Sequence, residues 1–276
     1  MYKTLLVPVD GRSRSARSVE LACRIAGTFD AHVIGLFLRP STYIPSPVRA
    51  EGGAELLQEL QDKMIRQLTE GAKMQFDAGV KASGTDRAEW RTAEGDRAEA
   101  VALHARYADL VIVNQTDPNA ADASHFADSM LLSVGRPVLL VPYTGEYKSF
   151  GQNVLVCWNA SREAARAVTD ALPLLTRAAK VTVMSVDGRD SPAGHGESPG
   201  ADIALYLARH GVKTEAARTE SGDVDIGNVI LSRAFDAGAD LIVMGGYGHS
   251  RVREIVLGGA TRTVLRSMTV PVLMSH

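Results

Sequence analysis

The chain carries the same sequence pattern twice. Its halves start alike, because Thr4 to Asp10 (TLLVPVD) matches Val154 to Asn159 (VLVCWN), and a helical pattern follows each. They also finish alike, because Tyr107 to Val113 (YADLVIV) matches Gly238 to Met244 (GADLIVM). Self-similarity on this scale indicates a duplicated domain. The polar stretch 142–153 is the natural join between the two copies.

Apolar runs alternate with helical patterns inside each repeat. In the first repeat, Leu5 to Val9 and His32 to Leu38 are predicted strands, with a helix from Ser13 to Phe29 between them. Apolar residues from Leu57 to Phe76 then recur at helical spacing. Strand and helix continue to alternate, which predicts a parallel sheet covered on both faces. We expect two α/β domains, 1–144 and 152–276, each a five-stranded parallel sheet with helices on both faces.

Composition narrows the classes of function. The net charge is −2 and 45% of the residues are hydrophobic, so no basic excess points to a nucleic acid partner. No stretch reaches the length of a membrane span, and the N-terminal run is too short for a secretory signal, so we expect no membrane partner and a cytoplasmic location. Cys23 and Cys157 lie in apolar surroundings and are expected to be reduced. The histidines lack metal-ligand spacing, so no metal site is predicted.

A glycine-rich excursion between two apolar strands is the strongest candidate for a binding site. Gly245, Gly246 and Gly248 follow the run Leu241 to Met244, and the pair Gly258-Gly259 precedes a helical pattern. Glycines let backbone amides approach an anion, and the start of a helix adds unpaired donors. The pattern therefore suggests a phosphate cradle. The alternative is that these glycines only close a loop between a strand and a helix.

The spacing Gly245-x2-Gly248-x9-Gly258-Gly259 resembles the G-x2-G-x9-G-[S/T] signature of the universal stress protein family. The resemblance extends over nearly the whole chain and implies the Rossmann-like fold of that family, also described as adenine nucleotide alpha hydrolase-like. It implies that these glycines hold the phosphates of ATP. Gly259 stands where the family has Ser or Thr, and Thr261, after Ala260, is the candidate substitute. No lysine follows the glycines, which argues against a P-loop NTPase.

The resemblance also implies contacts outside the glycine loop. Asn159 occupies the place of an aspartate that faces adenine or ribose, Val186 would offer backbone groups to adenine, and His249 would face the phosphates. Two alternatives stay open. Asn159 and Ser161 can instead cap the helix that begins near Arg162, and His249 can be an exposed loop imidazole.

The first repeat keeps the acid and lacks the glycines. Asp10 matches the family's aspartate, but the loop before Gly135 contains Asp117, Asp122 and Asp128, which would repel a triphosphate. We therefore expect ATP, with Mg²⁺ as its companion ion, in the C-terminal domain only.

No nucleophile elbow or zinc-protease motif is present, so catalysis beyond weak ATP hydrolysis is not expected. The leading hypothesis is a stress-response protein in which the bound nucleotide changes the surface offered to an unidentified protein partner. A scaffold for stress survival without nucleotide is the second. An α/β enzyme using a flavin or an adenylated substrate is the third.

The resemblance also implies how the two repeats associate. The last strands of the two repeats, Val138 to Val141 and Val272 to Met274, would pair within the chain and cover each other's edge, so that one chain mimics a dimer. A homodimer of two chains is left open.

Overall fold

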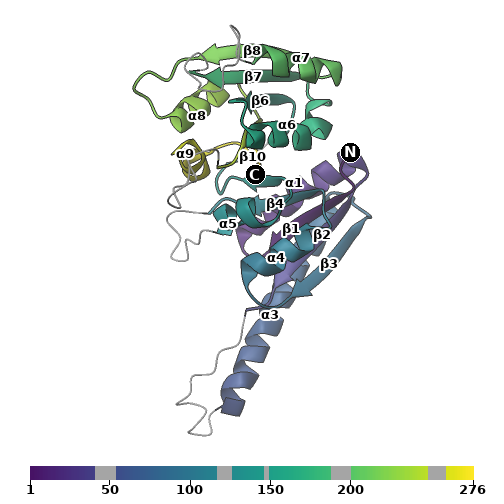
Figure 1. Cartoon of the computed structure of the whole chain (residues 1–276). Coiled ribbons are helices and arrows are strands. Elements are labelled where there is room, and N and C mark those ends of the chain that lie inside the picture. Colours follow the sequence, from purple (N-terminus) through teal and green to yellow (C-terminus); the bar gives the residue numbers. More distant parts are fainter. Residues whose placement is uncertain (41–53, 117–125, 146–148, 188–199, 248–258) are drawn as a thin grey trace. The chain divides into compact units, whose positions relative to one another are not determined.

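The structure, a computed structural model, describes residues 1–40, 54–116, 126–145, 149–187, 200–247 and 259–276 (Figure 1). Two compact units are distinguished by their internal contacts, Met1–Ile112 and Val113–His276. Each is α/β with parallel strands, which confirms the predicted fold class.

The first unit is built around a parallel sheet with strand order β3-β2-β1-β4. Its register begins with Thr4 opposite His32. The predicted helix and second strand have the observed bounds, and the first strand begins one residue earlier than predicted, at Thr4. The elements in chain order are β1 (Thr4–Val9), α1 (Ser13–Phe29), β2 (His32–Leu38), α3 (Ala54–Ala82), β3 (Ala88–Ala93), α4 (Arg97–Ala105) and β4 (Leu110–Asn114), the last of which continues past the unit boundary.

The second unit has the strand order β5-β10-β9-β6-β7-β8. Strands β6 to β10 are mutually parallel, as predicted for the second repeat. The elements are α5 (Phe126–Ser133), β5 (Val138–Val141), β6 (Asn153–Cys157), α6 (Arg162–Leu175), β7 (Lys180–Val186), α7 (Ala201–Arg209), β8 (Thr214–Thr219), α8 (Ile226–Asp236), β9 (Leu241–Gly245), α9 (Gly259–Ser267) and β10 (Val272–Ser275).

The pairing of β5 with β10 confirms the predicted association of the two last strands. The pairing is antiparallel, with Val272 opposite Leu140 and Met274 opposite Val138. Both strands are fully buried. Each strand thereby covers an edge that the other would leave open.

Burial follows the sequence pattern in the strands. Leu5, Leu6 and Val7 of β1 are fully buried, and so are Val154 and Val156 of β6. Continuous burial on both faces is the property expected of a parallel strand with helices above and below it. The apolar runs read from the sequence are therefore the core of each sheet.

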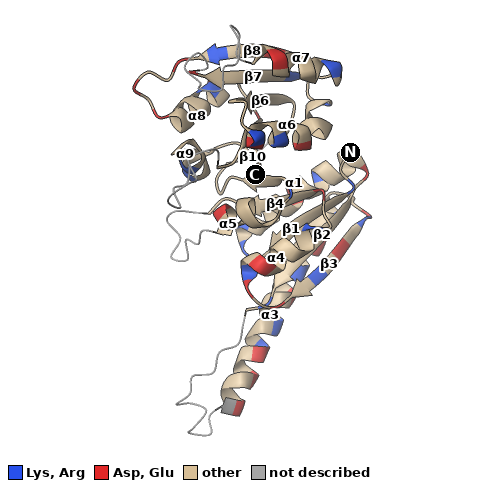
Figure 2. Cartoon of the chain, in the orientation of Figure 1, with Lys and Arg blue, Asp and Glu red and all other residues tan. Residues whose placement is uncertain are grey.

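Helix α3 behaves differently along its length. It is longer than the run Leu57 to Phe76, and its later part packs on the domain: Phe76 is buried, and its ring fills the space beside Gly35 where a side chain would clash. Leu60 and Met64 are 57% and 52% exposed, because this part of the helix runs past the end of its sheet (Figure 1). Charges of both signs line the helix (Figure 2).

The two cysteines are free in the structure, with Cys23 buried in α1 and Cys157 at the end of β6. Among the helices of the described residues, none has the length and apolarity needed to cross a membrane.

Candidate functional site

The first wall of the site is the turn between β6 and α6. Ser161 caps α6, since its side-chain oxygen accepts a hydrogen bond from Ala164 N at 3.1 Å. Asn159 stands one step earlier, and its Oδ1 accepts from Ser161 N at 3.1 Å. Capping is thus carried out directly by Ser161, while Asn159 orders the turn before it. The exposed Asn159 side chain still has a second lone pair on its oxygen and the amide donors of Nδ2.

The second wall is the end of β9, where glycine is required by packing. A Cβ added to Gly245 would lie 2.6 Å from Ala164 N and 2.7 Å from the carbonyl carbon of Glu163. Any side chain here would push β9 away from the first turn of α6. Gly245 therefore serves close approach of strand and helix, whatever else it contacts.

The start of the glycine loop is held by hydrogen bonds. Gly246 N donates to Ser275 O at 2.9 Å, and Tyr247 N donates to Thr261 Oγ1 at 3.3 Å. The Tyr247 hydroxyl donates to Asp128 Oδ1 at 3.2 Å. Tyr247 has a φ of 55°, a left-handed conformation that is uncommon outside glycine. Its burial, and then the Asp128 carboxylate, raise the pKa of the Tyr247 hydroxyl well above its ordinary value.

The third wall is the first turn of α9. This helix begins at Gly259, where an added Cβ would meet only Asp225 Oδ2, at 3.7 Å. Thr261 is 4% exposed, and its oxygen accepts the bond from Tyr247. A hydroxyl that accepts one hydrogen bond can still donate another, so Thr261 keeps the capacity predicted for it. The amides of a helix start give this corner positive character.

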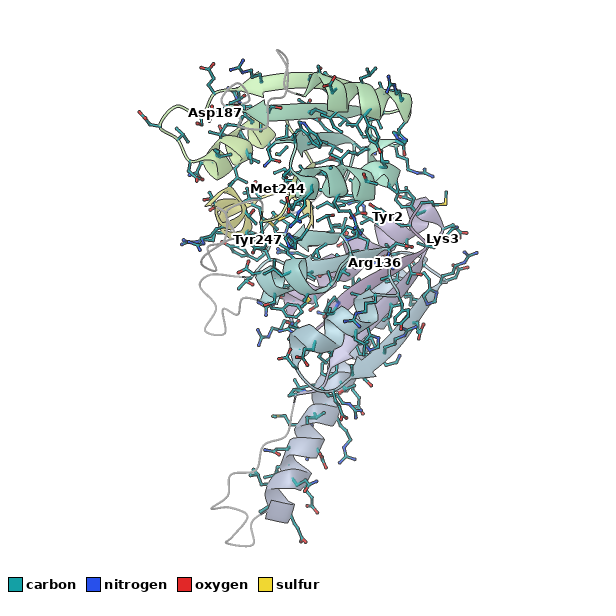
Figure 3. The ribbon with its side chains drawn as sticks, in the orientation of Figure 1. Tyr2, Lys3, Arg136, Asp187, Met244 and Tyr247 are labelled. Carbon is teal, nitrogen blue, oxygen red and sulfur yellow. The ribbon has the colours of Figure 1, made fainter. Side chains whose placement is uncertain are left out.

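These three walls and the end of β7 surround a pocket of about 410 Å³. Met244, at the end of β9, lies between them (Figure 3). The lining residues are Cys157, Trp158, Asn159, Met184, Val186, Ile226, Ile230, Met244, Gly245, Gly259, Ala260 and Thr261. Every predicted site residue in the described part of the chain belongs to this set. Gly248, His249 and Gly258 lie outside the described residues.

The apolar lining was not predicted from the sequence. Ile226 and Ile230 are four residues apart on α8, and Met184 lies inside β7. Helical spacing after the capping residue Asp225 could have marked the two isoleucines as one face. Nothing in the sequence indicated that this face would meet the end of β7. The pocket wall arises from the tertiary arrangement alone.

The described lining of the pocket is uncharged. Burial raises the pKa of the Cys157 thiol to about 12, so this sulfur stays protonated at physiological pH. Among the described lining residues, none is an acid or a base with a permanent charge. Such a cavity suits a flat apolar group with polar edges, and its volume is typical of small-molecule sites.

In the first repeat, the Asp10 carboxylate interacts with residues that follow it closely in the chain. It accepts from Arg12 N at 3.1 Å and from the Ser15 hydroxyl, and it pairs with Arg14 at 3.3 Å. Burial opposes ionisation of Asp10, but the hydrogen bonds of Ser15 and Arg12, with the charges of Arg14 and Arg97, outweigh burial and lower its pKa.

Acidic residues of the first repeat do not assemble an ion site in the described residues. Asp128, predicted to repel a triphosphate, accepts the hydrogen bond from Tyr247, while Asp117 and Asp122 lie outside the described residues. In the described parts of the chain, no group of three or more His, Cys, Asp or Glu side chains is placed to hold a metal ion.

Family membership follows from a sequence match that extends along both repeats. The sequence profile of the Universal stress protein family matches residues 1–142 and again residues 151–276. The chain belongs to the universal stress protein family. A universal stress protein from Archaeoglobus fulgidus DSM 4304 superposes over 99% of this chain and 97% of its own, with a TM-score of 0.72 and 16% identity, which shows the tandem fold.

Two other universal stress proteins are similar over shorter spans. Slr1230 from Synechocystis is 50% identical over 38 residues, which is 14% of this chain and 13% of that relative. The second is a universal stress protein from Archaeoglobus fulgidus, whose structure was solved in complex with dAMP. The superposition covers 50% of this chain and 97% of that protein, with 14% identity and a TM-score of 0.35. The dAMP is a property of that protein.

Proposed function

We propose that the second repeat binds an adenine nucleotide, with ATP and its Mg²⁺ as the main ligand, and that binding changes the surface offered to a protein partner. One observation carries the proposal. The residues predicted from the family resemblance, including Asn159, Val186, Gly245 and Thr261, line one pocket although they come from four separate segments.

The lining of the pocket offers both apolar and polar groups. Met184, Ile226 and Ile230 form an apolar wall suited to a purine ring, and Met and aromatic groups attract each other. Asn159 can both accept from a ribose hydroxyl and donate to it. The first turn of α9 offers amides to phosphate, and Gly259 leaves that approach open.

The effect on a partner would follow from the loop. Gly246, Tyr247 and Thr261 fix the two ends of the segment between β9 and α9. A phosphate bound to its amides would favour one arrangement of that segment over others, and a ligand shifts populations by its differential affinity. Hydrogen exchange of residues 248–258 should slow when ATP is added. Unchanged exchange at saturating ATP would reject this part of the proposal.

A scaffold that binds no nucleotide is the second candidate. Two observations support it. The Asn159 side-chain oxygen already accepts a hydrogen bond from Ser161 N, and Gly259 lacks the hydroxyl that the family has at this position. An amide also lacks the charged acceptor of a carboxylate, so ribose would be held less strongly. The two candidates differ in one measurable property, nucleotide affinity.

Isothermal titration of Mg-ATP into nucleotide-free protein separates them. The Gly259→Asp variant places a carboxylate at the start of α9, where it repels phosphate, and we expect at least about a ten-fold loss of affinity. Gly27→Asp is the matched control, because Gly27 lies on α1 with nothing within 4 Å of an added Cβ. Wild-type protein without binding heat or thermal shift would favour the scaffold.

A further inference from the structure

The first unit contains a pocket of a different kind. It measures about 590 Å³ and lies where β1 and β2 end, against α3 and the start of α4. Its lining includes Arg12, Arg39, Arg97 and Asp10, beside the apolar side chains of Phe37 and Leu68. Among the described residues, the pocket in the second repeat has no charged lining side chain, so the described linings of the two cavities differ in charge.

The charges around this first pocket do not cancel. Asp10 lies 3.3 Å from the Arg14 guanidinium and 4.0 Å from that of Arg12, and Arg97 adds to the positive field that lowers its pKa. Arg39 pairs with Glu94 at 2.7 Å. Arg12, Arg39 and Arg97 thus line the cavity, and Asp10 is the one carboxylate among its described lining residues, so this described lining carries more positive than negative charge.

The carboxylate of Asp96 stands next to Arg97 but has another role. Its Oδ1 accepts from the amides of Ala98 and Glu99 at 2.9 and 3.0 Å, which caps α4. A capping carboxylate interacts mainly with its helix start and is held there. Arg97 itself belongs to the lining of the pocket, and a guanidinium is a positively charged group.

A comparison of the two repeats shows which positions differ between the two pockets. Arg97 and Ile226 are equivalent, since each is the first residue of its helix and follows a capping aspartate, Asp96 or Asp225. Arg39 and Asp187 are also equivalent, since each follows the second strand of its repeat. The first residue of this helix is thus apolar in the second repeat and basic in the first, and the residue after the second strand is acidic in the second repeat and basic in the first.

The start of α1 adds to the same field. Arg12 is its N-cap residue, with no side-chain cap, and the first turn contains no acid. In the second repeat, α6 has Ser161 as a cap and Glu163 in its first turn. Because Gly11 and Arg12 line the pocket, the positive end of the α1 dipole faces the same cavity as the arginines.

We propose that this first-repeat pocket binds a small organic phosphate monoester, whose dianionic head meets Arg12, Arg39 and Arg97 while its apolar part lies against Phe37 and Leu68. Arginine binds phosphate through paired, charge-assisted hydrogen bonds, which favours this head group over a monoanion. The site is separate from the nucleotide pocket and does not depend on the function proposed for it.

Phenyl phosphate is a suitable probe, because it combines an apolar ring with a dianion. Titration into the full chain at neutral pH should give saturable binding that weakens as KCl is raised, with sodium benzenesulfonate, a monoanion, binding at least about ten-fold less well. Inorganic phosphate should bind more weakly than phenyl phosphate, because it lacks the ring that Phe37 and Leu68 would cover. Equal binding of all three anions would overturn the proposal.

Variants then locate the site. Arg97→Ile, which restores the residue found in the second repeat, should weaken phenyl phosphate at least about ten-fold. Leu68→Asp should weaken it as well, and since Leu68 is 45% exposed this change leaves the core intact. Arg209→Ile is the control, because it removes an exposed arginine on α7. Affinity unchanged in both pocket variants would overturn the proposal.

The nucleotide site provides a further check. Gly259→Asp should abolish ATP binding yet leave phenyl phosphate binding unchanged. If Gly259→Asp abolished both, the phosphate ester would be binding at the nucleotide pocket and the separate site would be disproved. If ATP failed to bind wild-type protein while phenyl phosphate bound, only the function proposed for the second repeat would fail.

Discussion

Asn159 stands where the family pattern has an aspartate, and its oxygen accepts from Ser161 N at 3.1 Å. Gly259 stands where the pattern has a hydroxyl, at the first residue of α9. Both positions border the pocket, and neither is compressed: Asn159 is exposed, and a Cβ on Gly259 would meet Asp225 Oδ2 only at 3.7 Å. The residues of the family pattern can therefore be restored without repacking.

Restoring them should strengthen nucleotide binding. Asn159→Asp adds a charged acceptor for ribose and Gly259→Ser adds a hydroxyl beside the phosphates, and each should raise ATP affinity about ten-fold. Titration calorimetry of the single and double variants measures this. Gly27→Ser, on the outer face of α1, serves as the control and should leave affinity unchanged. Weaker binding in both restored variants would mean that ATP does not lie along these residues.

Asp10 gives a prediction about pH. Its pKa is lower in the folded protein than its ordinary value of 3.8, so its contacts stabilise the fold above that pH, and the stabilisation is lost as the pH falls through the folded-state pKa. Asp10→Asn should cost about 1 kcal/mol at neutral pH. Urea unfolding at several pH values measures the difference in unfolding free energy between the wild type and Asp10→Asn. If that difference stayed constant into strong acid, the charge of the Asp10 carboxylate would not contribute to stability.

At the scale of elements, close approach between neighbouring elements shapes the pocket of the second repeat. Gly245 lets β9 meet α6, and Gly227 lets α8 meet α9, since a Cβ there would lie 2.8 Å from Ala260 O. These two glycines therefore set the distances between the elements that carry the lining residues Asn159, Ile226 and Thr261. The motif glycine Gly245 is thus explained by packing before any ligand is considered.

Gly245→Ala should lower stability more than its size suggests. The new methyl group would lie 2.6 Å from a backbone nitrogen that cannot rotate away, and overpacking of this kind costs about 1 to 3 kcal/mol. Gly27→Ala, inside α1 with open space around it, should be neutral or stabilising by up to about 1 kcal/mol. Chemical denaturation compares the two. Equal stability of the two variants would show that β9 and α6 are not packed this closely.

The elements also show how far sequence could lead. Alternating apolar and helical patterns predicted β1, α1 and β2 to within a residue, because buried strands and amphipathic helices carry local signals. The exposed half of α3 was not distinguishable from its buried half, since Leu60 and Phe76 follow the same helical spacing. The two residues differ in whether the sheet lies beneath them. This depends on the length of α3 and on where the helix packs in the fold, and neither is visible in the local sequence.

At the scale of the whole molecule, duplication followed by divergence explains the two pockets. The matching segments predicted the repeats, and the resemblance to the family predicted that Val138–Val141 and Val272–Met274 would pair, as β5 and β10 do. The apolar wall of the second-repeat pocket and the arginines of the first-repeat pocket were not predictable, because Ile226 and Arg97 line a cavity only once their helices meet the strand ends. Each repeat keeps the fold while its cavity takes a different lining.

The central claim is that the second repeat alone binds ATP. Native mass spectrometry of nucleotide-free protein with Mg-ATP counts bound nucleotides directly. We expect one ATP per chain in the wild type, none with Gly259→Asp, and one with Arg97→Ile, whose change lies in the first repeat. Two ATP molecules per chain, none in the wild type, or one that survives Gly259→Asp but is lost with Arg97→Ile would each contradict the claim.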